Sequence, residues 1–312
     1  MLKIAVIGSM NVDLVSRVPR FLLPGETLMG LDFQVFPGGK GGNQAVAASR
    51  LVPGVLMLGK LGDDQNGALY RQVLSDSGIQ ADCVETVPGV NNGTTVIEVA
   101  SDSGDNRIIY FPGANLLVDR AQIERHWAQL MRWDIFLMQL EIPLDTVAYA
   151  AGRLREAGKT VILDPAPAQP LPGELLAAAD YITPNETELA LLTGLETDSP
   201  DKLARAGQKL IRMGARRVIA KAGREGAYLI RGEEVFHAPG FKVAAVDTTA
   251  AGDSFNAGFA AGLSRGLQEK EALRFANAVG ALSTLASGAQ GAMPNYEAVT
   301  AFLQEQEKGK TS

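Results

Sequence analysis

From residue 135 onward, short apolar runs alternate with longer segments of helical periodicity. Apolar runs of this length predict buried strands, and apolar residues that recur every three or four positions predict helices. Strands joined through helices pack as right-handed crossovers in a parallel sheet. We therefore predict an α/β fold with a central, mostly parallel sheet and helices on both faces. Matching patterns also occur nearer the N-terminus. The expected strands are 4–7, 55–58, 135–140, 161–163, 181–182 and 218–221, and the expected helices are 43–51, 144–157 and 203–213. A hairpin with strands at 227–230 and 234–237 is expected near one sheet edge.

Two strand-rich stretches in the first half do not fit this alternation. One lies between residues 17 and 37, where prolines and glycines favour edge strands over central ones. The other predicts a hairpin with strands at 94–99 and 107–111. We expect the two stretches to pair into one small β-sheet lid on a single domain. The predicted domain is 1–312, and the predicted lid is about 13–38 plus 92–112.

The charge balance argues against polyanionic partners. The chain has 29 Lys and Arg residues against 35 Asp and Glu residues, for a net charge of −6, which repels nucleic acid and anionic membrane surfaces. No segment approaches the ~18 consecutive apolar residues of a membrane-spanning helix. Cys83 is the only cysteine, which excludes an intrachain disulfide and favours a reducing compartment, so that the cytoplasm is the expected location.

Three small residues, Ala250, Ala251 and Gly252, lead into a helix that is expected to run through about Gly266. Small side chains leave the backbone N–H groups at a helix start open to an anion, and the helix dipole adds positive potential. We therefore predict a phosphoryl site there. Asp253 lies in the first turn, where a carboxylate either caps the helix or acts as general base for a hydroxyl held beside the anion. Spacing alone leaves both alternatives open.

Two motifs carry a resemblance to a known family. The segment DTTAAGDSFN at 247–256 resembles the C-terminal signature of the ribokinase-like (PfkB) carbohydrate kinases, and GGKGGNQA at 38–45 resembles their N-terminal signature. The resemblance implies a three-layer ribokinase-like fold with a small β-sheet lid. It spans nearly the whole chain, with further matches at 8–13, 24–27, 62–64, 138–141, 185–188 and 288–290.

The resemblance implies that Asp253 is the catalytic base and that the amides of Ala250, Ala251 and Gly252 form the anion hole. This division suits phosphoryl transfer, in which a protein mainly positions the reactants and stabilises charge. The residues alone leave simpler alternatives open: Asn11 and Asp13 could cap turns, Lys40 could be a solvated loop charge, and Glu141 could be a surface charge. The sugar site that the resemblance implies consists of Asn11, Asp13, Gly39, Lys40, Asn43, Glu141 and Asp253.

A nucleotide site and a magnesium contact follow from the same resemblance. Glu188 matches a carboxylate associated with hydrated Mg²⁺, an ion that usually keeps several waters in proteins. The residues themselves offer a simpler role for Asn185, which precedes a helical segment and is a favoured N-cap. The implied nucleotide contacts are Asn185, Lys221, Gly223, Gly226, Gly252 and Asn277.

A monovalent cation, K⁺, is also implied beside the anion hole. Ala292 departs from the serine that is common in the family and removes one side-chain oxygen. Gly42 is a second departure, because alanine usually follows the residue that matches Gly41; two small residues are expected to be interchangeable there. The positions that match the cation loop are Asp247, Thr249, Ser283, Ala286, Gly288 and Ala292.

The reaction implied by the resemblance is ATP-dependent phosphorylation of a sugar hydroxyl with Mg²⁺. The favoured acceptor is the 5-hydroxyl of ribose or of a close pentose relative. The alternatives are a kinase for deoxyribose or a fructose-type sugar, a nucleoside kinase, and a non-catalytic sugar-binding regulatory protein on the same scaffold. Lid closure is expected to exclude water from the reaction. Lids of this family often pair between subunits, so a homodimer through the lid is expected.

Overall fold

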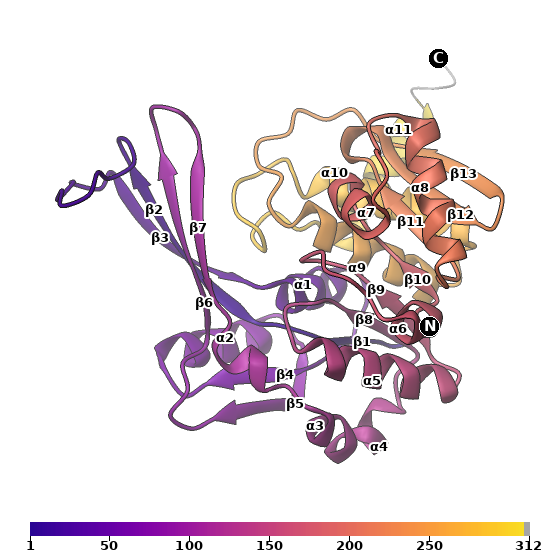
Figure 1. Ribbon diagram of the computed structural model, residues 1–312, viewed down its shortest axis with the longest axis horizontal. Coiled ribbons are helices and arrows are strands. Elements are labelled where there is room, and N and C mark those ends of the chain that lie inside the picture. The colour runs from indigo at the N-terminus through magenta and orange to yellow at the C-terminus, as the bar shows by residue number, and fades with distance from the viewer. Residues whose placement is uncertain (309–312) are drawn as a thin grey trace.

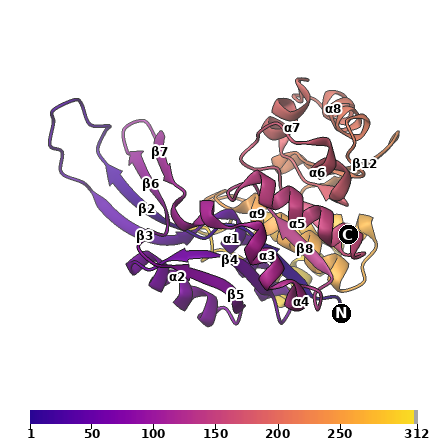
Figure 2. The ribbon, with the colours of Figure 1, turned by 60° about the horizontal axis from the view of Figure 1, so that its bottom comes forward.

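A nine-stranded sheet runs through the molecule, with helices on both faces (Figure 1, and turned by 60° in Figure 2). The computed structural model describes residues 1–308. The strands are β1 (Ile4–Ile7), β4 (Leu56–Gly62), β5 (Gln80–Val87), β8 (Ile135–Met138), β9 (Thr160–Leu163), β10 (Tyr181–Ile182), β11 (Val218–Lys221), β12 (Gly226–Arg231) and β13 (Glu234–Pro239). Their order is β13-β12-β11-β10-β9-β8-β1-β4-β5. Neighbours are parallel from β5 to β11, and β12 and β13 close one edge as an antiparallel hairpin.

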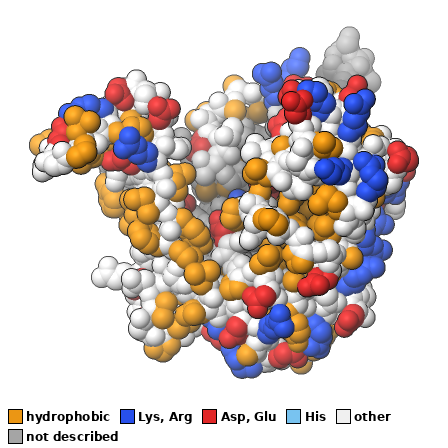
Figure 3. Space-filling view, in the orientation of Figure 1, with side chains coloured by type: hydrophobic (Ala, Val, Ile, Leu, Met, Phe, Trp, Pro, Cys, Tyr) orange, Lys and Arg blue, Asp and Glu red, His pale blue; other side chains and the backbone are white. Residues whose placement is uncertain are grey.

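A separate four-stranded sheet projects from the side of the main body (Figure 1). Its order is β3-β2-β6-β7, with β2 and β6 parallel and the outer pairs antiparallel. Figure 3 shows a hollow between this sheet and the main body. The two strand-rich stretches of the first half therefore pair as predicted, but the expectation of edge strands between residues 17 and 37 holds only for β3, because β2 pairs on both sides and lies mostly before residue 17. The strands are β2 (Asn11–Val18), β3 (Asp32–Gly38), β6 (Gly93–Ala100) and β7 (Asn106–Phe111).

The helices form two layers, one on each face of the large sheet. The first layer contains α1 (Lys40–Leu51), α2 (Gln65–Asp76), α9 (Ala251–Ser264), α10 (Glu269–Leu282) and α11 (Tyr296–Lys308). The second contains α3 (Arg120–Arg125), α4 (Trp127–Leu130), α5 (Leu144–Glu156), α6 (Gly173–Ala178), α7 (Glu186–Thr193) and α8 (Pro200–Arg212). Two short 3₁₀ turns lie at Gly113–Leu117 and Gly223–Glu225. Within residues 1–308, no helix has the length and apolar character that a membrane crossing requires.

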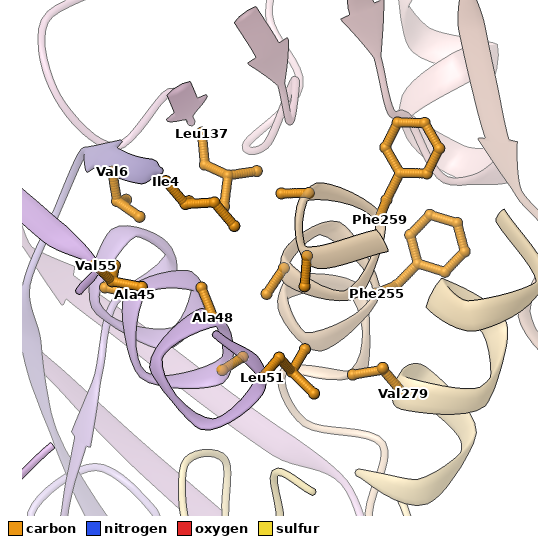
Figure 4. Close-up of a cluster of buried hydrophobic side chains, with 14 of the residues drawn as sticks. Ile4, Val6, Ala45, Ala48, Leu51, Val55, Leu137, Phe255, Phe259 and Val279 are labelled. Atoms are coloured by element: carbon orange, nitrogen blue, oxygen red, sulfur yellow. The ribbon is translucent and has the colours of Figure 1, made fainter. Parts of the chain in front are cut away.

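The core is split by the sheet because successive side chains of a strand point to opposite faces. Ile4 and Val6 of β1 pack against α1 and α9, whereas Ala5 between them faces the other helix layer (Figure 4). Small residues let α9 approach α10 closely: a methyl group at Gly258 would lie 2.9 Å from the side chain of Val279. The start of α9 is thereby fixed against α1 at the carboxyl ends of the central strands.

The alternating pattern, the parallel sheet and the edge hairpin are confirmed, but several boundaries differ. The strand predicted at 135–140 ends at Met138, because the next residues turn into the site described below. The helix predicted at 203–213 begins at Pro200, where the Ser199 side chain accepts from the amide of Lys202. Strand β4 continues to Gly62 through glycines that weaken its apolar pattern. Strand β5 and helices α2, α6, α10 and α11 were not among the expected elements.

Candidate active site

The start of α9 has an unusual backbone conformation. Ala250, its N-cap, has φ 58°, the only positive φ of a non-glycine residue among residues 1–308. This conformation costs alanine roughly 1–2 kcal/mol and persists only where the surrounding structure imposes it. The amides of Ala251 and Ser254 donate to Thr248 and Ala250. Those of Gly252 and Asp253 donate to no acceptor in residues 1–308, so two helix-start amides remain available for an anion.

Asp253 extends from this turn toward α1 and is only 5% exposed. Its Oδ2 accepts from Nδ2 of Asn43 at 3.0 Å, and its Oδ1 accepts from Nε2 of Gln44 at 3.0 Å. The capping alternative is therefore wrong, since the carboxylate bonds to another helix and caps nothing. Burial raises the pKa of Asp253 to about 6, against the lowering effect of Lys40 and with a further rise from Asp164. A carboxylate with this pKa is ionised at neutral pH and close to the optimum for proton transfer.

Lys40 begins α1 and lies among carboxylates. Burial alone lowers the pKa of its ammonium, but the negative charges of Asp253, Asp164, Glu141 and Glu188 outweigh burial and raise the pKa above its ordinary value. Lys40 is therefore a fixed, half-buried cation and not the solvated loop charge of the alternative interpretation. Its charge offsets the mutual repulsion of the carboxylates around it.

Glu141 connects the end of β1 with the start of α1. Its Oε2 accepts from Oγ of Ser9 at 2.6 Å, from the amide of Lys40 at 3.0 Å and from Nδ2 of Asn11 at 3.5 Å. Asn11 is buried, and its Oδ1 accepts from Nδ2 of Asn115 at 2.7 Å. Glu141 is therefore not a surface charge and Asn11 is not a turn cap. Together they present carboxylate and amide groups of the kind that bind a polyol.

The small sheet contributes a second wall to this cluster. Asp13 on β2 lies opposite Thr95 on β6, which in turn lies opposite Tyr110 on β7. Burial raises the pKa of Asp13, and its hydrogen bond with Thr95 acts in the opposite direction. Burial also raises the pKa of the Tyr110 phenol, which lies against the amide side chains of Asn11 and Asn115. The cluster therefore extends from the main sheet onto the inner face of the small sheet.

Beside the start of α9, Lys221 and Asp164 form an ion pair. Nζ of Lys221 at the end of β11 lies 3.0 Å from Oδ1 of Asp164 at the end of β9. A methyl group at Gly252 would lie 3.5 Å from the same Nζ. Gln44 Nε2 donates to Oδ2 of Asp164 at 3.1 Å. The ammonium is thus placed beside the free amides of α9, where it adds positive charge.

The N-cap role of Asn185 is realised. Its side chain accepts from the amide of Glu188 at 2.8 Å, and the Glu188 carboxylate accepts from the amide of Asn185 at 2.8 Å. This capping box begins α7. Burial raises the pKa of Glu188, against the lowering effect of Lys221 and with a further rise from Asp164. One oxygen of Glu188 is used by the cap, and the carboxylate still faces the Lys221–Asp164 pair.

The remaining residues that were predicted to contact the nucleotide have structural roles in or beside the edge hairpin. Asn277 on α10 donates through Nδ2 to the carbonyls of Ala238 at 2.8 Å and Pro239 at 3.2 Å. Gly226 has φ 97°, and a methyl group there would lie 2.2 Å from the Ala238 carbonyl oxygen. Gly223 has φ 49° in the 3₁₀ turn after β11, with open space around it. Gly226 and Asn277 both lie against the last residues of β13, whereas Lys221 and Gly252 lie together at the start of α9.

The predicted cation loop is assembled around Asp247. Its Oδ1 accepts from the amide of Thr249 at 2.9 Å and its Oδ2 from the amide of Gly288 at 3.0 Å. Hydrogen bonds to these amides keep the pKa of Asp247 below its ordinary value despite partial burial. Ser283 Oγ donates to the Gly280 carbonyl within its own helix end. The structure joins the 247–249 and 288 segments, while Ala286 is exposed and Ala292 supplies no side-chain oxygen.

The expectation that alanine could replace Gly42 is wrong for this chain. A methyl group at residue 42 would lie 1.7 Å from the hydroxyl of Tyr70 on α2. Tyr70 is fully buried, donates to the carbonyl of Gly38 at 2.6 Å and accepts from Nε2 of Gln290 at 3.0 Å. The hydroxyl therefore fills the space that an alanine side chain would need.

Comparison with known proteins decides the family. The profile of the pfkB family carbohydrate kinases matches residues 1–295. The chain belongs to that family. A ribokinase from Haemophilus influenzae is 40% identical over 304 residues, covering 96% of this chain and 98% of the relative. A deoxyribokinase from Salmonella typhi is 36% identical over 301 residues, covering 96% and 98%. The structure of an Arabidopsis thaliana ribokinase complexed with ribose and ATP superposes with a TM-score of 0.90 at 34% identity, covering 97% and 98%.

As a pfkB family carbohydrate kinase, the chain is a phosphotransferase that acts on an alcohol group. In residues 1–308, no three His, Cys, Asp or Glu side chains cluster closely enough to hold a metal ion by themselves.

Sequence reasoning missed part of the site. Asp164 follows β9 directly, and its place at the carboxyl end of a parallel strand was a usable signal. The other contributors were given no role, although three of them lie in segments that match the family; they are Gln44, Gln139 and Gln290 in those segments, and Asn115 and Tyr110 outside them.

Proposed function

We propose that this chain transfers the γ-phosphoryl group of ATP to a hydroxyl of a small sugar, with the 5-hydroxyl of ribose as the favoured acceptor. The observation that carries the proposal is the buried carboxylate of Asp253 in the same helix turn as the free amides of Gly252 and Asp253. A base beside an anion hole suits attack of a hydroxyl on a phosphoryl group. The ribose and ATP of the Arabidopsis complex and the ribokinase relatives support this choice of substrates.

In the proposed reaction, the sugar lies between the main sheet and the small sheet. Asp253 is ionised at neutral pH because its pKa is about 6. It accepts the hydroxyl proton as the sugar oxygen bonds to the γ-phosphorus and the bond to the leaving ADP oxygen breaks. The free amides of α9 and the Lys221 ammonium stabilise the charge on the transferred group. The sugar contacts proposed are Asn11, Asp13, Gly39, Lys40, Asn43 and Glu141, with the base Asp253.

ATP is proposed to bind beside Lys221, along the residues assigned to the nucleotide: Asn185, Lys221, Gly223, Gly226, Gly252 and Asn277. The donor chemistry fits Mg²⁺, since the carboxylates of Asp164 and Glu188 both face Lys221 and Mg²⁺ is usually held by one or two carboxylates, waters and substrate phosphates. Glu188 would hold the hydrated ion through water. When bound, Mg²⁺ supplies positive charge to the nucleotide phosphates.

A monovalent cation, K⁺, is proposed for the loop around Asp247, near the start of α9. The fit rests on the two chain segments that Asp247 joins through the amides of Thr249 and Gly288. The Asp247 carboxylate adds negative charge to a loop that is otherwise backbone. The remaining proposed positions are Ser283, Ala286 and Ala292. Rates measured with K⁺ and with Na⁺ at equal ionic strength test this part separately.

The test is a panel of acceptors assayed with MgATP by coupled ADP release. Ribose is expected to give the highest kcat/KM, and carbon-coupled phosphorus NMR of the product is expected to place the phosphate on carbon 5. The Salmonella deoxyribokinase relative makes 2-deoxyribose the rival acceptor, and fructose and a nucleoside complete the panel. Sugar binding without ADP release from any acceptor would contradict a kinase and support the regulatory alternative.

The small sheet is proposed to act as a lid and to pair with a second copy of the chain. Its exposed apolar residues include Phe33, Val35, Ile109 and Phe111, which share one sheet face by the strand register. Apolar surface gathered on one face typically marks an interface. Light scattering at micromolar concentration is expected to give a dimer, and Ile109→Glu is expected to give a monomer.

A cytoplasmic location remains part of the proposal. It is supported by Cys83, which is a free, buried thiol and therefore suits a reducing compartment.

A further inference from the structure

Each carboxylate oxygen of Asp253 accepts from an amide whose own carbonyl is held by a further buried glutamine. Gln44 donates to Asp253 Oδ1, and the Gln44 carbonyl accepts from Nε2 of Gln139 at 2.7 Å. Asn43 donates to Asp253 Oδ2, and the Asn43 carbonyl accepts from Nε2 of Gln290 at 3.1 Å. The same two-amide arrangement thus occurs on both sides of the carboxylate.

The glutamines determine which end of each amide faces the carboxylate. A side-chain amide has one accepting oxygen and one donating nitrogen, so rotation by 180° exchanges a donor for an acceptor. Gln44 Nε2 bridges Asp253 and Asp164, with distances of 3.0 and 3.1 Å. A rotated Gln44 would direct its oxygen at two carboxylates. Because Gln139 donates to the Gln44 carbonyl, it holds the orientation in which both carboxylates accept hydrogen bonds.

The glutamines are themselves constrained. Gln139 is held by packing: it is fully buried, and a methyl group at Gly8 would lie 2.0 Å from its Oε1, an atom that has no hydrogen-bond partner in residues 1–308. Gln290 donates a second hydrogen bond to Tyr70 at 3.0 Å, and Tyr70 donates to the carbonyl of Gly38 at the end of β3. Buried amide groups that have their hydrogen-bond partners restrict the orientation of the groups they contact.

We infer that Gln139 and Gln290 are positioning residues that fix the amides of Gln44 and Asn43 so that both oxygens of Asp253 accept hydrogen bonds. The inference rests on the proposed role of Asp253 as base. Neither glutamine is part of the substrate sites proposed above. Their shared effect is to keep the carboxylate ionised and aimed between the sugar and the anion hole, in a site where burial favours its protonated form.

The direct test is the titration of Asp253 in protein labelled with ¹³C at the aspartate carboxyl carbons, with Asp253→Asn identifying the signal. Gln139→Met and Gln290→Met keep the side-chain length and remove the donor. Without that donor, the amide of Gln44 or Asn43 is no longer held with its nitrogen toward Asp253. Loss of the hydrogen bond from that amide to the Asp253 carboxylate is expected to move the Asp253 midpoint upward by about one pH unit. Other charges that face the carboxylate, chiefly Lys40 and Asp164, are unchanged in both variants.

Gln122→Met is the matched control. Gln122 is also fully buried and donates to two backbone carbonyls, of Gly59 and Cys83, away from Asp253. It is expected to lower thermal stability without moving the Asp253 midpoint. If Gln290→Met does not fold, Tyr70→Phe replaces it, since that change removes only the hydroxyl to which Gln290 donates.

Activity supplies a second readout. In both glutamine variants the acid limb of the kcat/KM profile is expected to move upward with the Asp253 midpoint, and kcat to fall about tenfold. Gln290→Met is expected to raise the sugar KM more than Gln139→Met, because Asn43 is a proposed sugar contact. An Asp253 midpoint unchanged in both variants, or shifted equally by Gln122→Met, overturns the inference. If the unsubstituted chain phosphorylates no sugar, the proposed function fails, while the titration still decides the positioning role.

Discussion

Replacing Asp253 by asparagine separates its chemical role from its structural one. At neutral pH and above, an ionised carboxylate whose pKa is raised from 3.8 to about 6 disfavours the folded chain by roughly 3 kcal/mol. Asparagine removes that cost. Its NH₂ group, however, must face the amide donor of Asn43 or Gln44, which costs about 1–3 kcal/mol. The two effects nearly cancel, so Asp253→Asn is expected to fold and to melt within a few degrees of the unsubstituted chain.

Catalysis is expected to respond very differently. Loss of a general base lowers kcat by roughly 10²–10⁴-fold, equivalent to about 3–5.5 kcal/mol of transition-state stabilisation. The sugar KM is expected to change only a few-fold, because Lys40, Asn43 and Glu141 keep their side chains. Coupled ADP release measures turnover, and thermal unfolding followed by circular dichroism checks the fold. A folded Asp253→Asn variant with kcat within tenfold of the unsubstituted enzyme would refute the assignment of the base.

The remaining predictions concern pH and three substitutions. With the pKa of Asp253 about 6, kcat/KM is expected to be half-maximal near that pH and to fall about tenfold per unit well below it. Lys40→Met removes a charge that lowers the pKa of Asp253, so the acid limb should move to higher pH; a move to lower pH would contradict the electrostatics. Gly42→Ala places a methyl 1.7 Å from Tyr70 Oη and should cost about 1–3 kcal/mol in urea unfolding, a loss that Tyr70→Phe in the same chain should partly reverse. Gly226→Ala meets a β13 carbonyl oxygen at 2.2 Å and should lower stability by about 2 kcal/mol or more; an ATP KM that rises without such a loss would contradict its structural role.

The sheet was predictable because its information is local. Each strand and each helix after residue 135 is indicated by the pattern of its own consecutive residues. The right-handedness of the crossovers then restricts the order in which the strands can pair. The turn at Ala250 was predictable for a similar reason, since small residues at a helix start leave amides open. Helix α7 has a weak apolar pattern, and only the N-cap residue Asn185 indicated where it begins.

Site residues fell into two groups. Those in the two signature segments, among them Asp253, Lys40 and Asn43, were identified through resemblance, and the structure brings them to one edge of the sheet. Asp164 was missed, and Gln44 was given no role although it lies in the 38–45 signature; both act through partners far away in the chain. A buried glutamine has no periodic signature, because its role depends on which atom of a distant residue it faces. Only the packing of α1 against α9 and the strand ends determines that.

Gly42 also shows that a residue's role can depend on a side chain far away in the sequence. In the sequence, glycine and alanine differ by one methyl group, and a flexible backbone near a helix start tolerates either. In the fold, α2 brings the Tyr70 hydroxyl into the volume of that methyl, and the hydroxyl uses the position to bond both Gly38 and Gln290. The identity of residue 42 is therefore set by a side chain on another helix. The departure from the family motif at residue 42 is therefore best interpreted together with Tyr70, because the two side chains share one packed volume.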